Sequence, residues 1–364
     1  MKKISWWEPL IDNSDVKAAA RTVKLNYPNE GIFTQKLEKK LSSLLRVKHC
    51  ICVTSGTAAI FLSLKSLNIK EGDEVIVPDV TFAATANAVD LCGAKPVLVD
   101  VSSDTATMDP NVLEKRISSK TKAIIPVHIS GRGADMEKIL KISRKYKIHI
   151  VEDAAEAFMS KHKKKYLGTF GTLGCFSFSA NKIITSGQGG FISTNNDKLN
   201  SIIRKLKNQG IVGKSDGGQT IHHMTGYNFK YTNLQASIVL NQIKSLKKRI
   251  SRLKKHYEIY RDNLDNLPEV KVFKFNIKEG EFPLWTDFRC ENREKLLSYL
   301  IKRKIDCRKF WYPLHTQKQF KTNSKNFKNS KKLCRNLLWL PSALRLNNND
   351  ILKVCKNIRN FYKK

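Results

Sequence analysis

The stretch Cys50-Ile51-Cys52-Val53-Thr54-Ser55-Gly56-Thr57-Ala58-Ala59 decides the fold class of this 364-residue chain. A short apolar run leads through a turn of hydroxyl residues and glycine into a helical pattern, which is typical of a βα unit. Six further apolar runs alternate with helical stretches up to about residue 195: 74–77, 96–99, 123–127, 148–151, 175–178 and 190–193. This alternation predicts a three-layer α/β/α sandwich, in which helices cover both faces of a mainly parallel central sheet.

The remaining segments predict additional helices and a smaller C-terminal α/β domain. A long helical pattern runs from about Thr232 to Leu267 and ends near Pro268. Shorter helices are expected at 15–25, 35–45, 293–302 and 350–362, strands at 282–290 and 305–308, and a solvated loop at 317–332. We therefore expect a large domain over residues 1–245 and a small domain over residues 246–364.

The formal charge of +34 raises the question of nucleic-acid binding. The positive residues are spread along the chain between apolar positions of amphipathic segments, as in the run 243–250, and no zinc-finger spacing or RNP-like aromatic run is present. This distribution favours solvated basic faces over a nucleic-acid site. A basic surface also attracts an anionic diphosphate ligand.

The cysteine pattern and the hydropathy favour a cytoplasmic protein. The eight cysteines form no CxxC pair, so we expect reduced core thiols and neither disulfides nor a metal site. No stretch reaches the about 18 apolar residues that a membrane span needs. The N-terminus has no apolar signal-peptide region.

Three loops that follow predicted strands carry candidate functional residues. Ligands of mainly parallel sheets bind beyond the carboxyl ends of the strands. The residues 54–59 open a helix whose free N–H groups suit a phosphate, although Ser or Thr before a helix is usually only an N-cap. The residues 152–156 are rich in acids, and Lys182 lies between apolar neighbours and a glycine-rich turn. The absence of GxGxxG and of GxxxxGK[ST] argues against a nicotinamide dehydrogenase and a P-loop enzyme.

Taken together, these motifs resemble the DegT/DnrJ/EryC1/StrS family of sugar aminotransferases, which are fold-type-I pyridoxal-phosphate enzymes. The resemblance covers nearly the whole chain. The matching segments are 30–34, 55–59, 72–78, 81–89, 127–128, 131–132, 134–136, 152–155, 176–178 with Lys182, 226–230, 234–236 and 312–315. So many matches in order make the resemblance specific.

The resemblance implies a role for several residues. Lys182 is expected to bind the aldehyde of pyridoxal 5'-phosphate and to move protons during catalysis. Asp153 is expected to face the pyridine nitrogen and Phe82 to cover the ring. The phosphate is expected to be held by Gly56, Thr57, Ser177 and an Asn228 from the neighbouring subunit, which implies a homodimer with shared active sites.

Two positions depart from the family pattern. Many members have Gln where this chain has Glu156, beside the phenolic oxygen of the cofactor. A carboxylate there is repelled unless a proton is shared, so we expect Glu156 to share a proton or to reach substrate. Many members also have Glu where this chain has Gln188.

The expected substrate contacts are His315, Arg308 and Lys230, the last two with a diphosphate. For His128, a structural role is at least as well supported as a substrate contact.

The resemblance implies transfer of an amino group from L-glutamate to a nucleotide-linked keto-deoxysugar, with C4 of a 4-keto-6-deoxyhexose favoured, in polysaccharide or glycan biosynthesis. Two alternatives lie within the family: a C3 aminotransferase, and a sugar dehydratase, which Lys182 argues against because that branch has histidine there. Two others are a basic binding protein and a catalytically silent regulator.

Overall fold

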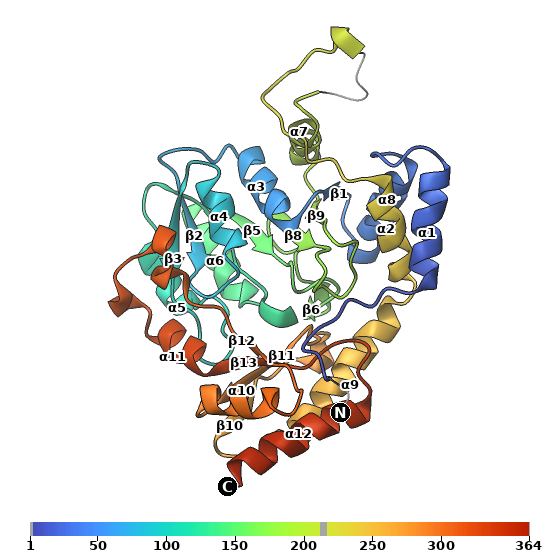
Figure 1. Cartoon of the computed structure of the whole chain (residues 1–364). Helices are drawn as coiled ribbons and strands as arrows, with labels where there is room; N and C mark the ends of the chain where they lie inside the picture. The colour runs from blue at the N-terminus through green and yellow to red at the C-terminus, as the bar shows by residue number, and fades with distance from the viewer. Residues whose placement is uncertain (1–2, 212–216, 364) are drawn as a thin grey trace.

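The computed structural model describes residues 3–211 and 217–363. Its larger part is built on a seven-stranded sheet with the order β1-β9-β8-β5-β4-β2-β3 (Figure 1). In that order the strands are His49–Val53, Gly190–Thr194, Leu173–Ser177, His149–Asp153, Thr121–Ile124, Glu74–Pro78 and Lys95–Val99. Only β9 runs against its neighbours, because β1 and β8 both pair with it in antiparallel fashion, whereas all other pairs are parallel. The predicted mainly parallel sheet is confirmed.

Helices cover both faces of this sheet. Successive side chains of a strand point to opposite faces, so the apolar strands place buried side chains on both. In β1, Ile51 and Val53 pack on the face covered by α3 (Gly56–Ser66), α4 (Ala84–Asp90) and α7 (Asp197–Lys207). Cys50 and Cys52 point to the other face. That face is covered by α2 (Ile32–Leu45), α5 (Pro110–Leu113), α6 (Met136–Tyr146) and α8 (Asn233–Ile243), and α1 (Asn13–Lys24) packs against α8. The α/β/α sandwich is thereby confirmed.

A second, antiparallel sheet lies below the first in Figure 1. Its order is β10-β11-β13-β12, with bounds Val270–Val272, Thr286–Cys290, Leu337–Leu340 and Arg308–Lys309. The helices α9 (Leu246–Leu264), α10 (Arg293–Ile301) and α12 (Asn348–Tyr362) pack around it, and α11 (Lys328–Asn336) precedes β13. The N-terminal segment packs beside this part of the chain, since Ile4 forms a parallel bridge with Ile305, three residues before β12. The division of the chain at residue 245 stays a prediction.

Several predicted boundaries in the C-terminal part are wrong. The long helix is two helices, because the chain turns at Lys244 and Ser245 between α8 and α9. The strand predicted at 282–290 begins only at Thr286, and the strand predicted at 305–308 is the short β12. The predicted loop 317–332 contains 3-10 turns and the first residues of α11. The strands β10 and β13 were not predicted, since each is too short to show a clear alternation.

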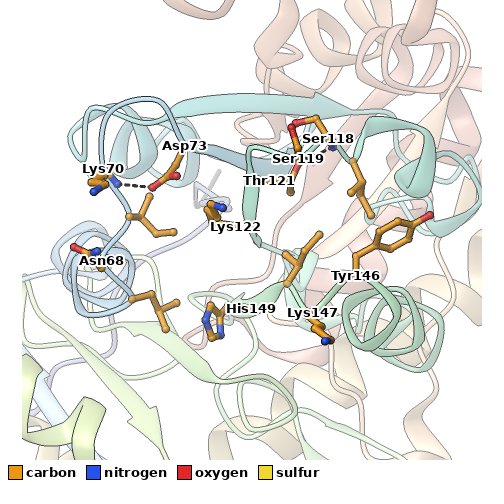
Figure 2. Close-up of a pocket in the computed structure, with 14 residues that line it drawn as sticks. Asn68, Lys70, Asp73, Ser118, Ser119, Thr121, Lys122, Tyr146, Lys147 and His149 are labelled. Carbon is orange, nitrogen blue, oxygen red and sulfur yellow. Dashed lines mark hydrogen bonds between the residues drawn. The ribbon is translucent and has the colours of Figure 1, made fainter.

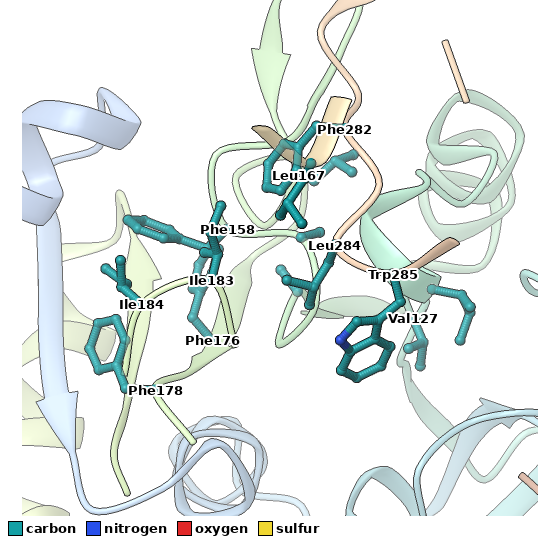
Figure 3. Close-up of a cluster of buried hydrophobic side chains, with 14 of the residues drawn as sticks. Val127, Phe158, Leu167, Phe176, Phe178, Ile183, Ile184, Phe282, Leu284 and Trp285 are labelled. Carbon is teal, nitrogen blue, oxygen red and sulfur yellow. The ribbon is translucent and has the colours of Figure 1, made fainter. Parts of the chain in front are cut away.

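One apolar cluster joins the two sheets and lies next to the candidate site. It contains Phe176 and Phe178 of the larger sheet region together with Phe282, Leu284 and Trp285 from the segment before β11 (Figure 3). Trp285 packs near Trp6 and Trp339, with ring centroids 5.3 and 5.0 Å away. The two sheets therefore share a core rather than meeting through a polar interface. No helix of the described residues is both long and apolar enough to cross a membrane.

Candidate active site

The candidate residues gather at the carboxyl edge of the larger sheet. Asp153 ends β5, Ser177 ends β8, and Lys182 follows five residues later. Because β1 runs parallel to β8 through the intervening antiparallel β9, the turn that begins α3 at Gly56 reaches the same edge. The topology thus brings together three segments that are far apart in the sequence.

Lys182 and Glu156 form a buried ion pair. The Lys182 Nζ lies 3.6 Å from Glu156 Oε1, and the two side chains are 11% and 7% exposed. The backbone N–H of Ser130 donates to the other oxygen, Glu156 Oε2, over 2.8 Å. Burial raises the pKa of Glu156 to about 7, an effect that the charge of Lys182 and the Ser130 hydrogen bond partly oppose.

The Asp153 carboxylate is buried and held on both oxygens. Thr85 Oγ1 donates to Asp153 Oδ2 over 2.8 Å, and the N–H of Ala155 reaches Asp153 Oδ1 over 3.1 Å. Thr85 is in turn 2.9 Å from the hydroxyl of Thr81. The acid therefore has a fixed orientation at the end of β5, as a carboxylate that faces a ligand nitrogen requires.

The beginning of α3 forms a small, donor-rich cradle. Ser55 is the N-cap, and its hydroxyl accepts from the N–H of Ala58. The N–H groups of the first helical residues, Gly56 and Thr57, have no partner within a helix. A Cβ at Gly56 would lie 3.1 Å from the Cβ of Ser177, so a larger residue would close the space between the α3 turn and β8. The helix N-terminus and the Ser177 hydroxyl can hold a phosphate here.

The start of β11 contributes a polar network that the sequence did not reveal. Ser130 Oγ donates to Asp287 Oδ1 over 2.7 Å, and Trp339 Nε1 donates to the same oxygen over 2.9 Å. Arg132 forms a buried ion pair with Asp287 Oδ2 at 2.5 Å. Trp285 lies with its ring 5.1 Å from Lys182 Nζ. These contacts join residues at least 52 positions apart, so no local spacing signals them.

The other predicted residues lie around this centre or away from it. Phe82 is 61% exposed, and Asn228 and Lys230 are exposed on the segment that follows α7. Arg308 is exposed, with its guanidinium 4.9 Å from the ring of Trp6. The side chain of Gln188 is exposed.

The two histidines have structural partners. His128 Nε2 lies 3.0 Å from Glu152, and its Nδ1 accepts from the N–H of Ala134, which favours the structural reading. His315 is 2% exposed, and its Nδ1 lies 2.7 Å from Asp79 Oδ2. Asp79 also accepts from the N–H of His315. A substrate contact for His315 stays a prediction.

A separate cavity of about 700 Å³ lies at the opposite edge of the sheet (Figure 2). Its lining includes Thr121 and His149, which begin β4 and β5, and the basic side chains of Lys70, Lys122 and Lys147. The cavity is therefore at the amino ends of the parallel strands, with the sheet between it and Lys182. In the described residues, no group of three or more potential ligands is arranged to hold a metal ion.

Comparison with known proteins agrees with this geometry. The model of the DegT/DnrJ/EryC1/StrS aminotransferase family matches residues 9–359. The GDP-perosamine synthase of Escherichia coli O157:H7 is 34% identical over 100% of this chain and 99% of its own length. That of Vibrio cholerae is 31% identical over 98% of both chains. The solved structure of S. venezuelae DesV with a ketimine intermediate matches with a TM-score of 0.91 and 28% identity, over 96% of this chain and 94% of DesV.

Proposed function

The chain belongs to the DegT/DnrJ/EryC1/StrS aminotransferase family, and from that premise we propose that it transfers the amino group of L-glutamate to C4 of a GDP-linked 4-keto-6-deoxyhexose. That it is a pyridoxal-phosphate-dependent sugar aminotransferase follows from the family and its solved members. The choice of GDP and of C4 is supported by the two GDP-perosamine synthases, which align along their full lengths. Such a product serves cell-surface polysaccharide synthesis.

The residues at the carboxyl edge fit pyridoxal phosphate. A lysine amine for the aldehyde, a buried oriented carboxylate for the ring nitrogen, and a helix N-terminus for the phosphate all occur at one edge of the sheet. A Cβ added at Gly56 would meet Ser177, so the space between α3 and β8 depends on glycine at this position. When bound, the cofactor supplies an electron sink for a carbanion next to nitrogen.

Each of these residues has a distinct task in the proposed reaction. Asp153 would keep the ring nitrogen protonated, because its carboxylate is held by Thr85 and Ala155. Lys182 Nζ would hold the aldehyde and, once free, would carry a proton at the substrate carbon. Gly56 and Thr57 would donate backbone N–H groups to the phosphate, and Ser177 its hydroxyl.

We also propose that a second copy of the chain completes the site. Phe82 and Asn228, to which the family resemblance assigns contacts with the cofactor, are exposed in the single chain. Asn228 forms a β-bridge with Asn208, the residue that follows α7, at the base of the loop that projects beyond α7 (Figure 1). A homodimer would cover both residues and would bring Asn228 to the partner's phosphate. Arg308 and Lys230, which are exposed, remain the proposed contacts for the diphosphate, and His315 the proposed contact for the sugar.

The observation that carries the proposal is the buried pairing of Lys182 with Glu156 at the sheet edge that also presents Asp153. Borohydride reduction of the cofactor-loaded protein is expected to fix a phosphopyridoxyl group on Lys182, read by peptide mass spectrometry. Lys182→Ala is expected to retain cofactor and to lose at least about 1,000-fold in turnover, since the proton carrier is gone. A modified peptide elsewhere, or full activity of this variant, would contradict the assignment.

The substrate is tested by offering keto-sugar nucleotides with ¹⁵N-labelled glutamate and measuring the product mass. The label is expected in the amino sugar formed from the GDP-linked 4-keto-6-deoxy sugar. That substrate should react with a higher kcat/KM than a dTDP- or UDP-linked analogue. Preferential transfer to a 3-keto sugar would mean that the enzyme aminates C3 and not C4. The family assignment would be unaffected.

A further inference from the structure

Glu156 lies beside Lys182 in the interior of the protein. Both side chains are almost completely buried, and within the described residues Glu156 is the acid that forms an ion pair with Lys182. Two opposite charges in such surroundings lose hydration that their mutual attraction only partly replaces. Transfer of one proton from the ammonium to the carboxylate removes both charges at once.

We propose that Glu156 is a second proton-carrying residue of this site, exchanging a proton with Lys182 Nζ, and that Asp287 acts through Ser130 as the positioning residue that holds it there. In this exchange an N–H bond of the Lys182 ammonium breaks and an O–H bond forms on Glu156. The products are a neutral amine and a neutral acid, so the total charge is unchanged. The inference rests on the proposed function, because it concerns the lysine of that reaction.

The charged groups that face Glu156 come from four segments. Lys182 follows β8, Asp153 ends β5, and Asp287 lies in β11 with Arg132 paired to it. Asp153 and Asp287 oppose ionisation of Glu156, whereas Lys182 favours it. The raised pKa of Glu156, about 7, is consistent with a group that gains and loses its proton near neutral pH.

The position of Glu156 depends on the second sheet. Ser130 has a φ of 53°, a backbone conformation that is uncommon outside glycine. Its hydroxyl is tied to Asp287, and its carbonyl accepts from the N–H of Leu284 over 2.8 Å. These two bonds from the segment before and within β11 orient the Ser130 N–H that donates to Glu156. Asp287 is therefore a positioning residue, which acts on the lysine through Ser130 and Glu156.

The test measures the protonation of Lys182 in the cofactor-free, full-length protein. A pulse of acetic anhydride at pH values from 5 to 11, followed by peptide mass spectrometry, gives the labelled fraction of Lys182 relative to exposed Lys138. The wild type is expected to show two inflections, one near pH 7, because the two groups titrate as a pair. Glu156→Gln is expected to show one inflection, with its midpoint at least about one pH unit lower, since a neighbouring carboxylate no longer stabilises the ammonium.

Three variants separate positioning from general effects. Glu156→Asp is expected to restore a higher midpoint, because the charge returns. Ser130→Ala, which removes the bond to Asp287 but keeps the backbone N–H, is expected to lower the midpoint by less than Glu156→Gln. Glu38→Gln changes another buried carboxylate, which pairs with Arg204 and Lys207, and is expected to leave Lys182 unchanged.

Equal midpoints in the wild type and Glu156→Gln would overturn the proton exchange, and a wild-type midpoint in Ser130→Ala would overturn the positioning role. The labelling needs neither cofactor nor sugar. Its outcome is therefore independent of whether the proposed sugar is the substrate. In the loaded enzyme, Glu156→Gln is expected to lose the inflection near pH 7 from the pH profile of kcat.

Discussion

Glu156 shows how a single residue can serve a site at the expense of stability. Its carboxyl is buried next to Lys182, and its pKa is raised from 4.5 to about 7 in the folded chain. The folded state therefore holds a proton that the unfolded chain releases as the pH rises above 4.5. The stability that this proton contributes is present below pH 4.5 and is lost as the pH rises to about 7.

We expect Glu156→Gln to reveal this loss. Glutamine keeps the shape but does not titrate, so its advantage over the wild type should grow by about 3 kcal/mol between pH 4.5 and pH 7.5. Urea unfolding of the two cofactor-free proteins at pH 4.5, 6 and 7.5 measures the difference in the free energy of unfolding. Parallel curves at all three pH values would show that Glu156 titrates normally in the folded chain.

Among the elements, α11 illustrates how a distant carboxylate starts a helix. The segment before it is rich in Lys and Asn, and the sequence predicts a loop there. In the fold, Asp100 follows β3 and accepts hydrogen bonds from the N–H groups of Asn329 and Ser330 and from the Ser330 hydroxyl. An anion at a helix N-terminus satisfies donors that the helix itself leaves free.

Asp100→Ala is expected to destabilise the protein by about 1–3 kcal/mol, because buried donors at the beginning of α11 lose their acceptor. Asp104→Ala is the matched control: its carboxylate pairs with Lys271 but is 75% exposed, and its loss should cost less than about 0.5 kcal/mol. Thermal unfolding of both variants makes the comparison. Equal shifts in the two would mean that Asp100 does not hold α11.

For the whole molecule, the single chain leaves apolar side chains exposed on a projecting segment. Ile221 is 72% exposed and Met224 is 37% exposed, in the described part of the segment that carries Asn228. Phe82, near the carboxyl edge of the sheet, is 61% exposed. The proposed homodimer would remove these side chains from water and would supply Asn228 to the neighbouring site.

Ile221→Asp is expected to shift the dimer toward monomer, because a charge would replace an apolar side chain in the dimer interface. Cofactor binding is expected to weaken at least about 10-fold, because the monomer lacks the partner's Asn228. Light scattering after gel filtration and a cofactor titration measure both effects. Ile301→Asp on α10, where the side chain is 57% exposed, is the control and should change neither. A monomeric wild type with full activity would contradict the shared site.

The amino-acid order by itself determined the larger sheet and the chemical groups on it. Each βα unit is encoded locally, because continuous apolar runs and helix N-caps depend on neighbouring residues. Lys182, Asp153 and Gly56 stood out in this way, each just after a strand. The short strands β10 and β13 and the turn between α8 and α9 did not, because distant packing decides them.

Only the tertiary structure decided how these groups are held. The distance of 3.6 Å from Lys182 to Glu156, the bond from Ser130 to Asp287 and the burial of His315 against Asp79 join residues from separate elements. The sequence could name Glu156 as a departure from the family pattern, but not its partner. Burial and the facing charges set its protonation, and both arise only when the two sheets close on a common core.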